Sequence, residues 1–338
     1  MIRDRWFRGR TTRAFTLQWH LTNSCPFHCR HCYDRTNRKQ LSYPESLTVL
    51  SDFRDFCRSR RVRPQVSLSG GDPMMFRGFW DLYRVIAEAG IPISILGNPI
   101  GEDEIDGLMQ IRAPDYYQVS LEGLREHNDS IRGARHFDKT RSFLREARHR
   151  GLKTHVMFTL TRDNLDQFLP LAEELRGLTT RFTFNRLSQV GEAANLSLPD
   201  RDDYAAFLLR CLAARRRNPV IGFKDNLFNI VRHWHRRSLF PGCTGHGCGA
   251  AFNFVALLPD GEVHACRKFP SLLGNIREKR LLEIYDSPAA RRYRDGTAAC
   301  RKCSLKNSCG GCLAVTHGQG RDPLNERDPF CFISERPA

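Results

Sequence analysis

The 338-residue sequence lacks any apolar run close to the roughly 20 residues needed to cross a bilayer. Its basic first residues, 1–13, are not followed by the apolar segment of a signal peptide. Internal repeats and low-complexity tracts are also absent. These absences exclude a membrane-spanning protein and a repeat array, so we expect a cytoplasmic protein with no membrane partner. Hydrophobic residues make up 41% of the chain, enough for the cores of about two domains.

Acidic residues and lysine are scarce relative to arginine. The chain has 37 acidic and 53 basic residues, a net charge of +16, and only eight of the basic residues are lysine. Such an excess favours either a nucleic acid or acidic peptide as partner, or a basic surface that is simply solvated. No run interleaves basic and aromatic residues in a repeating pattern. The solvated surface is therefore preferred, and a nucleic-acid partner is not expected.

Isolated cysteines are few. Of thirteen cysteines only Cys57 and Cys211 stand alone, and we interpret both as buried helix residues. Three others lie within 25–32 and eight within 243–331. This content is too dilute for a disulfide scaffold, and clustered cysteines in a reducing compartment usually hold metal.

Short β-rich runs alternate with helical segments from residue 15 to about residue 187, the pattern of parallel β/α units. Six strands are predicted, at residues 15–21, 65–69, 91–96, 116–121, 154–160 and 182–187. Helices are predicted at residues 44–60, 79–89, 103–111, 138–150, 165–176 and 200–217. The fold class is therefore α/β, an open or partial TIM-like (β/α)6 barrel, with its functional residues in the loops after the strands.

Glycine and cysteine become frequent after residue 241, where apolar periodicity is weak. One hairpin is predicted, from 252–258 through a Pro-Asp-Gly turn into 262–265. Metal cross-links are expected to stabilise this region. The predicted organisation is a basic arm (1–14), a barrel (15–190), a helical bridge (191–240) and a cysteine-rich domain (241–338).

The loop after the first strand carries three cysteines with x3 and x2 spacing: Cys25, Cys29 and Cys32. Thiolates in this pattern can hold three irons of a 4Fe-4S cluster and leave the fourth iron open for substrate or cofactor. The alternative from spacing alone is a structural zinc site that also uses His28 or His31.

The second strand ends in Gly70-Gly71-Asp72-Pro73, at the same end of the predicted barrel. Paired glycines let a ligand approach backbone carbonyls without hindrance from Cβ. Together with the cysteine loop one β/α unit earlier, this segment resembles the radical SAM superfamily. In that family the cysteine loop binds the cluster, and a Gly-Gly-Glu-Pro-like motif holds the amino group of S-adenosylmethionine (SAM).

The resemblance covers the first six strands and implies the residues that bind SAM. Asp72 replaces the usual glutamate, and His31 replaces the aromatic residue that faces adenine. Ser120 and Arg132 would contact the methionyl carboxylate or the ribose, since a hydroxyl and a guanidinium suit those acceptors. Leu187 would pack beside adenine, although an ordinary core role is an equal alternative.

The C-terminal cysteines follow a second pattern, Cys248, Gly261-x4-Cys266 and then four more at x2, x5 and x2 spacing before Cys331. This resembles a SPASM domain, the auxiliary-cluster domain of radical SAM peptide and protein maturases, with a pair of zinc ribbons as the alternative. The resemblance implies two fully ligated 4Fe-4S clusters in this domain. With the cluster expected in the loop after the first strand, the chain would hold three. The first would use Cys243, Cys248, Cys266 and Cys312, and the second Cys300, Cys303, Cys309 and Cys331.

The family resemblance implies that reductive cleavage of SAM yields a 5'-deoxyadenosyl radical, which abstracts hydrogen from the substrate. Within the SPASM group, sulfatase-maturing enzymes carry an aspartate directly after the cysteine of the Gly-x4-Cys motif. Arg267 stands there in this chain and cannot act as a base, so that activity is not favoured. We expect modification of a peptide by thioether formation, carbon-carbon cross-linking or oxidation, with a small molecule or cofactor precursor as the alternative substrate. No catalytic residue is assigned.

The expected partners are a peptide and an electron donor such as flavodoxin or ferredoxin. A separate leader-recognition protein is a further expected partner, because only fourteen residues precede the first strand. The basic arm could also clamp an acidic peptide, with a solvated tail as the preferred interpretation. A different class of function, electron transfer or iron-dependent nucleic-acid binding, has no need for the Gly70-Gly71-Asp72-Pro73 segment. A radical SAM RNA methylase is disfavoured by the eight-cysteine tail.

Overall fold

Strands and helices alternate from residue 14 to residue 186 in the computed structural model, which describes residues 12–334. The six strands of this part are β1 (Ala14–Thr22), β2 (Arg63–Gly70), β3 (Ile93–Leu96), β4 (Tyr116–Ser120), β5 (Thr154–Leu160) and β6 (Arg181–Arg186). All six are parallel and are ordered β6-β5-β4-β3-β2-β1. The prediction of a partial barrel is confirmed.

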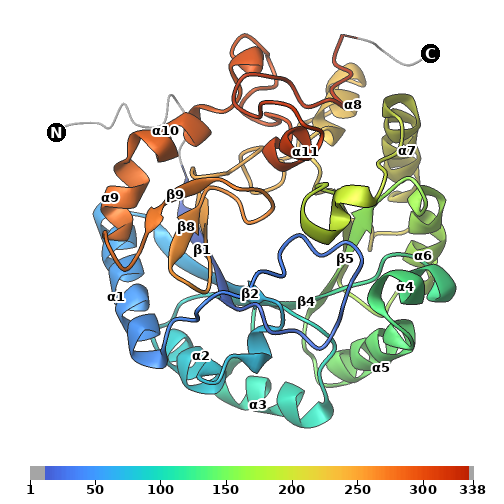
Figure 1. Cartoon of the computed structure of the whole chain (residues 1–338). Helices are drawn as coiled ribbons and strands as arrows, with labels where there is room; N and C mark the ends of the chain where they lie inside the picture. The colour runs from blue at the N-terminus through green and yellow to red at the C-terminus, as the bar shows by residue number, and fades with distance from the viewer. Residues whose placement is uncertain (1–11, 335–338) are drawn as a thin grey trace.

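Helices surround the strands on the outside of the barrel (Figure 1). They are α1 (Tyr43–Arg60), α2 (Phe79–Glu88), α3 (Glu102–Arg112), α4 (Arg125–Arg132), α5 (His136–His149) and α6 (Phe168–Glu174). Ser42 and Glu45 form a capping box that fixes the start of α1. The sequence analysis missed α4, because only Asn128 and Ile131 of its eight residues are buried and the apolar pattern is correspondingly weak.

The alternation of side chains along the strands separates a dry outer layer from a polar interior. Leu17 and Trp19 of β1 are buried in the hydrophobic core, whereas Thr16 and Gln18 line a cavity inside the barrel. Gln65 and Ser67 of β2 line the same cavity. Because neighbouring side chains of a strand point to opposite faces, one face of the sheet packs on the helices and the other lines a binding space.

The predicted bridge contains α7 (Arg201–Ala214) and α8 (Phe228–Trp234). Between them, residues 220–222 run alongside β6, since the Phe182 amide donates to the Val220 carbonyl and the Gly222 amide donates to the Phe182 carbonyl, both at 2.7 Å. This pairing carries the following residues, including Lys224, toward the C-terminal end of β6.

The C-terminal region adds three strands to the same sheet. These are β7 (Phe254–Leu257), β8 (Glu262–His264) and β9 (Leu272–Asn275), followed by α9 (Leu281–Asp286), α10 (Pro288–Asp295) and α11 (Leu313–Gly318). The predicted hairpin is confirmed as the antiparallel pair β7 and β8. The sequence analysis did not anticipate that β7 pairs in parallel with β1, which makes one nine-stranded sheet.

One hydrophobic core extends across the barrel and the C-terminal region. Tyr285 of α9, for example, packs edge-on against Phe15 of β1 and Phe56 of α1, with ring centroids 5.5 and 5.1 Å apart. Cys57 and Cys211 are buried in α1 and α7 as predicted. The domain boundaries at residues 14, 190 and 240 stay predictions.

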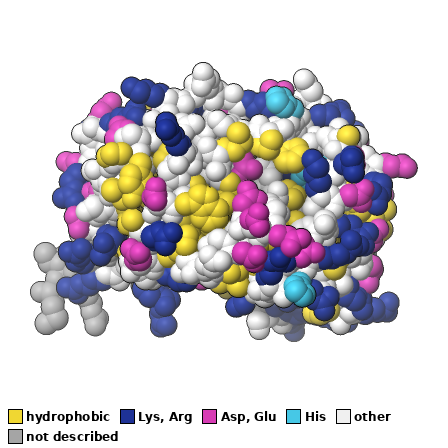
Figure 2. All heavy atoms as spheres, turned by 90° about the horizontal axis from the view of Figure 1, so that it is seen from below, with side chains coloured by type: hydrophobic (Ala, Val, Ile, Leu, Met, Phe, Trp, Pro, Cys, Tyr) yellow, Lys and Arg dark blue, Asp and Glu magenta, His cyan; other side chains and the backbone are white. Residues whose placement is uncertain are grey.

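The surface seen in Figure 2 carries Lys and Arg interspersed with Asp and Glu rather than collected in one basic patch. The basic residues of the predicted arm, Arg3 to Arg10, lie outside the described residues. Within residues 12–334, none of the helices combines the length and the apolar character that crossing a bilayer requires.

Candidate active site

The loop that follows β1, residues 23–34, is called here the cluster loop. Its three cysteines, Cys25, Cys29 and Cys32, line a cavity of about 450 Å³, the cluster cavity. The Ser24 amide donates to the Thr22 hydroxyl at 2.9 Å, and the Cys32 amide donates to the Cys29 carbonyl at 3.1 Å. These bonds fold the loop back over the C-terminal end of the barrel.

Gly70 and Gly71 line the cluster cavity, and the structure gives a further reason for them. A Cβ on Gly70 would lie 2.1 Å from the Thr22 carbonyl oxygen, and one on Gly71 would lie 2.4 Å from the Ser24 carbonyl oxygen. The Gly71 amide donates to Thr22 and the Asp72 amide donates to Ser24, at 2.7 and 2.8 Å. The paired glycines are therefore needed for close backbone packing against the cluster loop, whatever they leave open for a ligand.

The Asp72 carboxylate lies behind the two glycines and is 7% exposed. It accepts hydrogen bonds from the Met74 amide (3.1 Å) and from Asn98 Nδ2 (3.0 Å). Asn98 Nδ2 also lies 3.7 Å from Cys25 Sγ. The sequence analysis missed Asn98, although its position directly after β3 and Gly97 follows the same rule that located the other loops.

Glu122 is the centre of a buried polar cluster beneath the cluster loop. Its carboxylate pairs with Arg132 Nε and His31 Nε2, both at 2.9 Å, and accepts from the Thr159 amide at 2.6 Å. Burial opposes ionisation, but the charges of Arg132 and His31 hold the pKa of Glu122 well below its usual range. No role for Glu122 was predicted from the sequence.

Arg132 connects this cluster to the cysteines. Its Nη1 lies 3.7 Å from Cys29 Sγ. Burial raises the pKa of Cys29, and the positive charge of Arg132 opposes that shift and so favours the thiolate. His31 Nδ1 is buried without a hydrogen-bond partner in the described structure, which leaves a polar atom free for a ligand. Ser120 and Leu187 also line the cluster cavity, with Leu187 only 1% exposed.

The eight C-terminal cysteines divide between two further cavities. A cavity of about 510 Å³, the auxiliary cavity, is lined by Cys243, Cys248, Cys266 and Cys312. A small cavity under α8 is lined by Cys300, Cys303, Cys309 and Cys331. The grouping matches the predicted sets, and their role as ligands stays a prediction. No group of three His, Cys, Asp or Glu side chains within residues 12–334 has the arrangement of a single-ion site.

Burial makes these thiols poor acids in the absence of iron. It raises the pKa of Cys300 to about 11 and that of Cys312 to about 12. Because thiolates rather than thiols bind iron, cluster binding would have to release these protons.

A buried ion-pair network joins the barrel to both cysteine sets. Arg186, at the end of β6, donates to both carboxylate oxygens of Asp328 at 2.7 Å and to Asp225 at 2.9 Å. The Asp328 carboxylate accepts from the Cys312 amide, and its carbonyl accepts from the Cys331 amide, at 2.8 and 2.9 Å. Neither Arg186 nor Asp328 was predicted, because residues 142 positions apart meet only in the folded chain.

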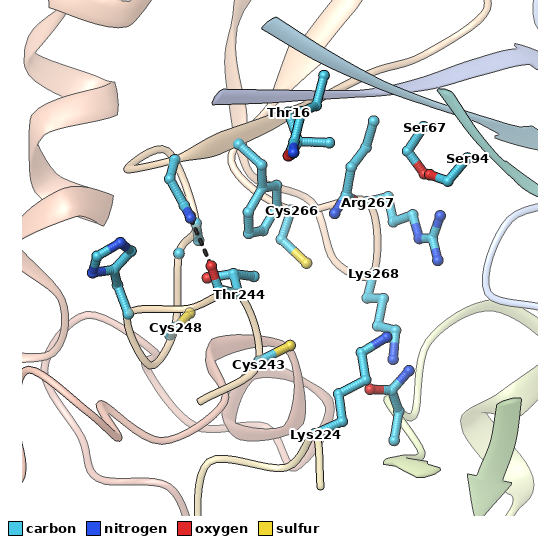
Figure 3. A pocket seen from close by; sticks show the side chains of 18 of the residues that line it. Thr16, Ser67, Ser94, Lys224, Cys243, Thr244, Cys248, Cys266, Arg267 and Lys268 are labelled. Atoms are coloured by element: carbon cyan, nitrogen blue, oxygen red, sulfur yellow. Dashed lines mark hydrogen bonds between the residues drawn. The ribbon is translucent and has the colours of Figure 1, made fainter. Parts of the chain in front are cut away.

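The cluster cavity and the auxiliary cavity share part of their lining. Arg186, Arg267 and Lys268 border both, and Lys224 borders the auxiliary cavity. Figure 3 shows Lys224, Arg267 and Lys268 beside three cysteines of the auxiliary cavity, Cys243, Cys248 and Cys266. Burial lowers the pKa of Lys224 to about 8; Cys243 opposes this shift, whereas Lys268 and Arg267 add to it.

The donor sets fit iron-sulfur clusters and SAM. Three thiols beside one open cavity suit a cluster with a free iron, and two sets of four suit fully ligated clusters. The free Nδ1 of His31 and the half-buried backbone of Gly70 and Gly71, which lines the cluster cavity, leave polar groups for a nucleoside and an amino acid moiety.

Family models agree with this architecture. The radical SAM superfamily model matches residues 19–175, and the model of the iron-sulfur cluster-binding SPASM domain matches residues 248–312. The chain belongs to the radical SAM superfamily and carries a C-terminal SPASM domain. It is thus an oxidoreductase-type enzyme whose domains imply 4Fe-4S clusters and SAM.

Three known proteins illustrate the range of its relatives. The chain is 25% identical to AdoMet-dependent heme synthase of Methanosarcina barkeri, over 94% of this chain and 95% of that protein. It is 27% identical to PqqA peptide cyclase of Ruegeria pomeroyi, over 93% of this chain and 86% of that protein. The structure of Streptococcus suis SuiB bound to precursor peptide SuiA has a TM-score of 0.74 and 19% identity, over 95% of this chain and 76% of that one, which shows the shared fold.

Proposed function

We propose that this chain is a radical SAM enzyme that abstracts a hydrogen atom from a peptide and thereby directs its post-translational modification. The observation that carries the proposal is the common border of the cluster cavity and the auxiliary cavity. A substrate at this border would lie between the site of hydrogen abstraction and a redox centre, as an oxidation requires.

The proposed ligand sets are those predicted from the sequence. Cys25, Cys29 and Cys32 would hold the SAM-binding cluster. The two C-terminal sets of four would hold two auxiliary clusters, which makes three in all. Gly70, Gly71, Asp72, His31, Ser120, Arg132 and Leu187 are the proposed SAM contacts. Of these, Asp72 would act through the backbone, because its side chain is committed to Asn98 and Met74.

When bound and reduced, the first cluster with SAM supplies a 5'-deoxyadenosyl radical. The residues of this chain have other tasks. Glu122 orients Arg132 and His31, and Arg132 favours the thiolate of Cys29. The proposed reaction is a two-electron oxidation of the substrate, which loses a hydrogen atom first and then one electron and one proton. An auxiliary cluster held by the C-terminal cysteines would accept that second electron. A flavodoxin or ferredoxin is the proposed donor of the electron that starts each turnover.

A peptide substrate is supported by the likeness to PqqA peptide cyclase over 93% of this chain. A separate leader-recognition protein would assist its binding. The second candidate substrate is a tetrapyrrole. It is favoured by the end-to-end match with AdoMet-dependent heme synthase and by the cations that border the cavities.

The test uses the anaerobically reconstituted enzyme. We expect about twelve irons with matching labile sulfide, four for each cluster. Dithionite and SAM should give slow formation of 5'-deoxyadenosine without substrate. A short peptide encoded beside the gene should accelerate this formation and lose hydrogen by mass spectrometry, whereas iron coproporphyrin should not. Stoichiometric zinc without sulfide contradicts the cluster assignment, and acceleration by the porphyrin alone contradicts the peptide proposal.

A further inference from the structure

Three cations line the auxiliary cavity without a carboxylate partner, and two of them, Arg267 and Lys268, also line the cluster cavity. Arg267 and Lys268 belong to the turn between β8 and β9, and Lys224 follows the segment that pairs with β6. Arg267 donates to the Ser69 hydroxyl at 3.4 Å. Within the described part of the chain, no carboxylate forms an ion pair with any of the three.

Hydrogen bonds hold the turn that carries two of these cations. Ser271 Oγ donates to the Cys266 carbonyl and accepts from the Cys266 amide, at 3.0 and 3.1 Å. Ser188 Oγ, just after β6, donates to the Lys268 carbonyl at 3.0 Å. The backbone of the turn is thus fixed across the mouth of the barrel, which preorganises the two side chains for a ligand.

The acidic residues that line the auxiliary cavity do not neutralise these cations. Asp225 is engaged by Arg186 Nε at 2.9 Å and by the Leu227 amide at 2.9 Å. Asp115 precedes the first residue of β4 and so lies at the N-terminal end of the strands, opposite the turn. The negative groups that do act on Lys224 and Lys268 are thiols of the auxiliary cavity, such as Cys243. Partly buried cations without a carboxylate partner are costly, so a bound carboxylate would add to the stability of the site.

We infer that Lys224, Arg267 and Lys268 form a binding site for a carboxylate group of the substrate at the border of the two cavities. The inference rests on the proposed function and deepens it, because it selects a peptide with an acidic residue near the modified position. Figure 3 shows the side chains of Lys224 and Lys268 pointing toward one another, and the two charges interact. In the proposed site a carboxylate between them would accept charge-assisted hydrogen bonds. The same chemistry is available in the propionate of a tetrapyrrole.

Two pairs of probes test the site, each differing only in its carboxylates. The first pair is the capped peptide Ac-Ala-Glu-Ala-Glu-Ala-NH2 and its counterpart with Gln in place of Glu. The second pair is coproporphyrin III and its tetramethyl ester. Dissociation constants are measured anaerobically with the SAM-bound holoenzyme, by calorimetry for the peptides and by fluorescence for the porphyrins.

The variants are Lys224→Met and Lys268→Met, with exposed Lys279→Met as the matched control. We expect wild type and Lys279→Met to bind the Glu peptide at least about tenfold more tightly than the Gln peptide, as charge-assisted hydrogen bonds predict. Either cavity variant should reduce that ratio to near one. Two variants on separate elements keep the test valid if one fails to fold, and an unchanged iron content identifies an intact holoenzyme.

The outcomes separate the inference from the proposed function. Discrimination of the porphyrin pair alone, lost in the variants, supports the carboxylate site and contradicts the peptide substrate. Peptides bound without preference for Glu, or with a preference that survives in both variants, overturn the site and leave the peptide proposal standing. Absence of binding by all probes overturns the site. If Lys224→Met and Lys268→Met change only the reduction potential of the auxiliary cluster, the carboxylate site is also overturned, because the cations would then serve only to offset the charge of the cluster.

Discussion

The cluster loop and the cysteine-rich C-terminal region bring thiols together in opposite ways. The cluster loop collects three cysteines within residues 25–32, at the end of one strand of a well-packed barrel. The auxiliary cavity collects Cys243, Cys248, Cys266 and Cys312 from segments up to 69 positions apart, since 312 minus 243 is 69. A local turn is sufficient for the first set, whereas the second depends on long-range contacts.

Because of this difference, we expect the loss of thiols to have different consequences in the two regions. The barrel has alternating strands and helices whose apolar faces form a core that includes none of Cys25, Cys29 and Cys32, so we expect its fold to persist without them. The C-terminal region has short elements and relies on three supports: the pairing of β7 with β1, the Arg186–Asp328 pair and the predicted metal ligands. Loss of thiols should therefore affect chemistry in the first case and both chemistry and folding in the second.

The largest effect is expected from replacing Cys25, Cys29 and Cys32 together by Ala. Formation of 5'-deoxyadenosine should fall below detection and about four irons should be lost, because the SAM-binding cluster has no other thiols. Circular dichroism should stay close to that of wild type. Cys57→Ala, which changes a buried thiol of α1, is the control and should keep all the iron. Persistent cleavage of SAM by the triple variant would show that the cluster loop is wrongly assigned.

Cys331→Ala tests the opposite half of the comparison. The second auxiliary set would lose one ligand, so product formation should fall at least about tenfold and the C-terminal region should become more susceptible to proteolysis. Uncoupled cleavage of SAM, which needs only the barrel site, should persist. Undiminished product formation would rule out a required role for an intact second auxiliary cluster.

Glu122→Gln tests how far the cluster loop depends on the barrel beneath it. The substitution keeps the shape but removes the charge that orients Arg132 and His31. Uncoupled formation of 5'-deoxyadenosine should fall by about 10- to 100-fold, the usual cost of losing a group that supports metal ligands. Glu126→Gln, four residues further along the chain, is the control, since this carboxylate lies in the exposed first turn of α4. Equal rates in the two variants would contradict a positioning role for Glu122.

Asp328→Asn tests the joint between the two regions. Arg186 and Asp328 are almost fully buried, so removal of one charge should reduce the free energy of unfolding by about 3–5 kcal/mol. Urea denaturation of the holoenzyme measures the change, and release of iron should accompany the transition. Asp322→Asn, on an exposed loop, is the control. If both variants unfold at the same urea concentration, the network does not hold the regions together.

The smallest expected effect is a change in the pH dependence of stability, caused by a histidine of the barrel. Burial, with the charges of Arg181 and Lys224, lowers the pKa of His155 to about 4. The unfolded chain binds this proton near pH 6.5, so its contribution to stability is full above that pH and is lost as the pH falls toward 4. His155→Phe, which can still stack on Tyr116, should therefore lose less stability between pH 7 and pH 5 than wild type. Urea midpoints at pH 7 and pH 5 measure this loss of stability for both proteins. An equal loss in wild type and in His155→Phe would contradict the prediction.

Elements with a local sequence signal were predicted, and residues brought to the site by long-range contacts were not. The six parallel strands and the hairpin were predicted because their β-rich runs and turn residues are local signals. Asn98 was accessible to the same reasoning, since it follows β3 directly. Lys224 and Asp328 carried no such signal: one reaches the site through the pairing of residues 220–222 with β6, and the other through a contact with Arg186.

The sequence by itself determined the periodic elements, the contiguous thiols of the cluster loop and the kinds of donor atoms available, because these depend on neighbours within a few residues. Only the tertiary structure decided that β7 joins the sheet beside β1, and that Glu122 supports the cluster loop. It also decided that three cations from two distant segments line the same auxiliary cavity. The physical reason is that burial and Coulomb interactions act through space, so their partners are set by packing rather than by position along the chain.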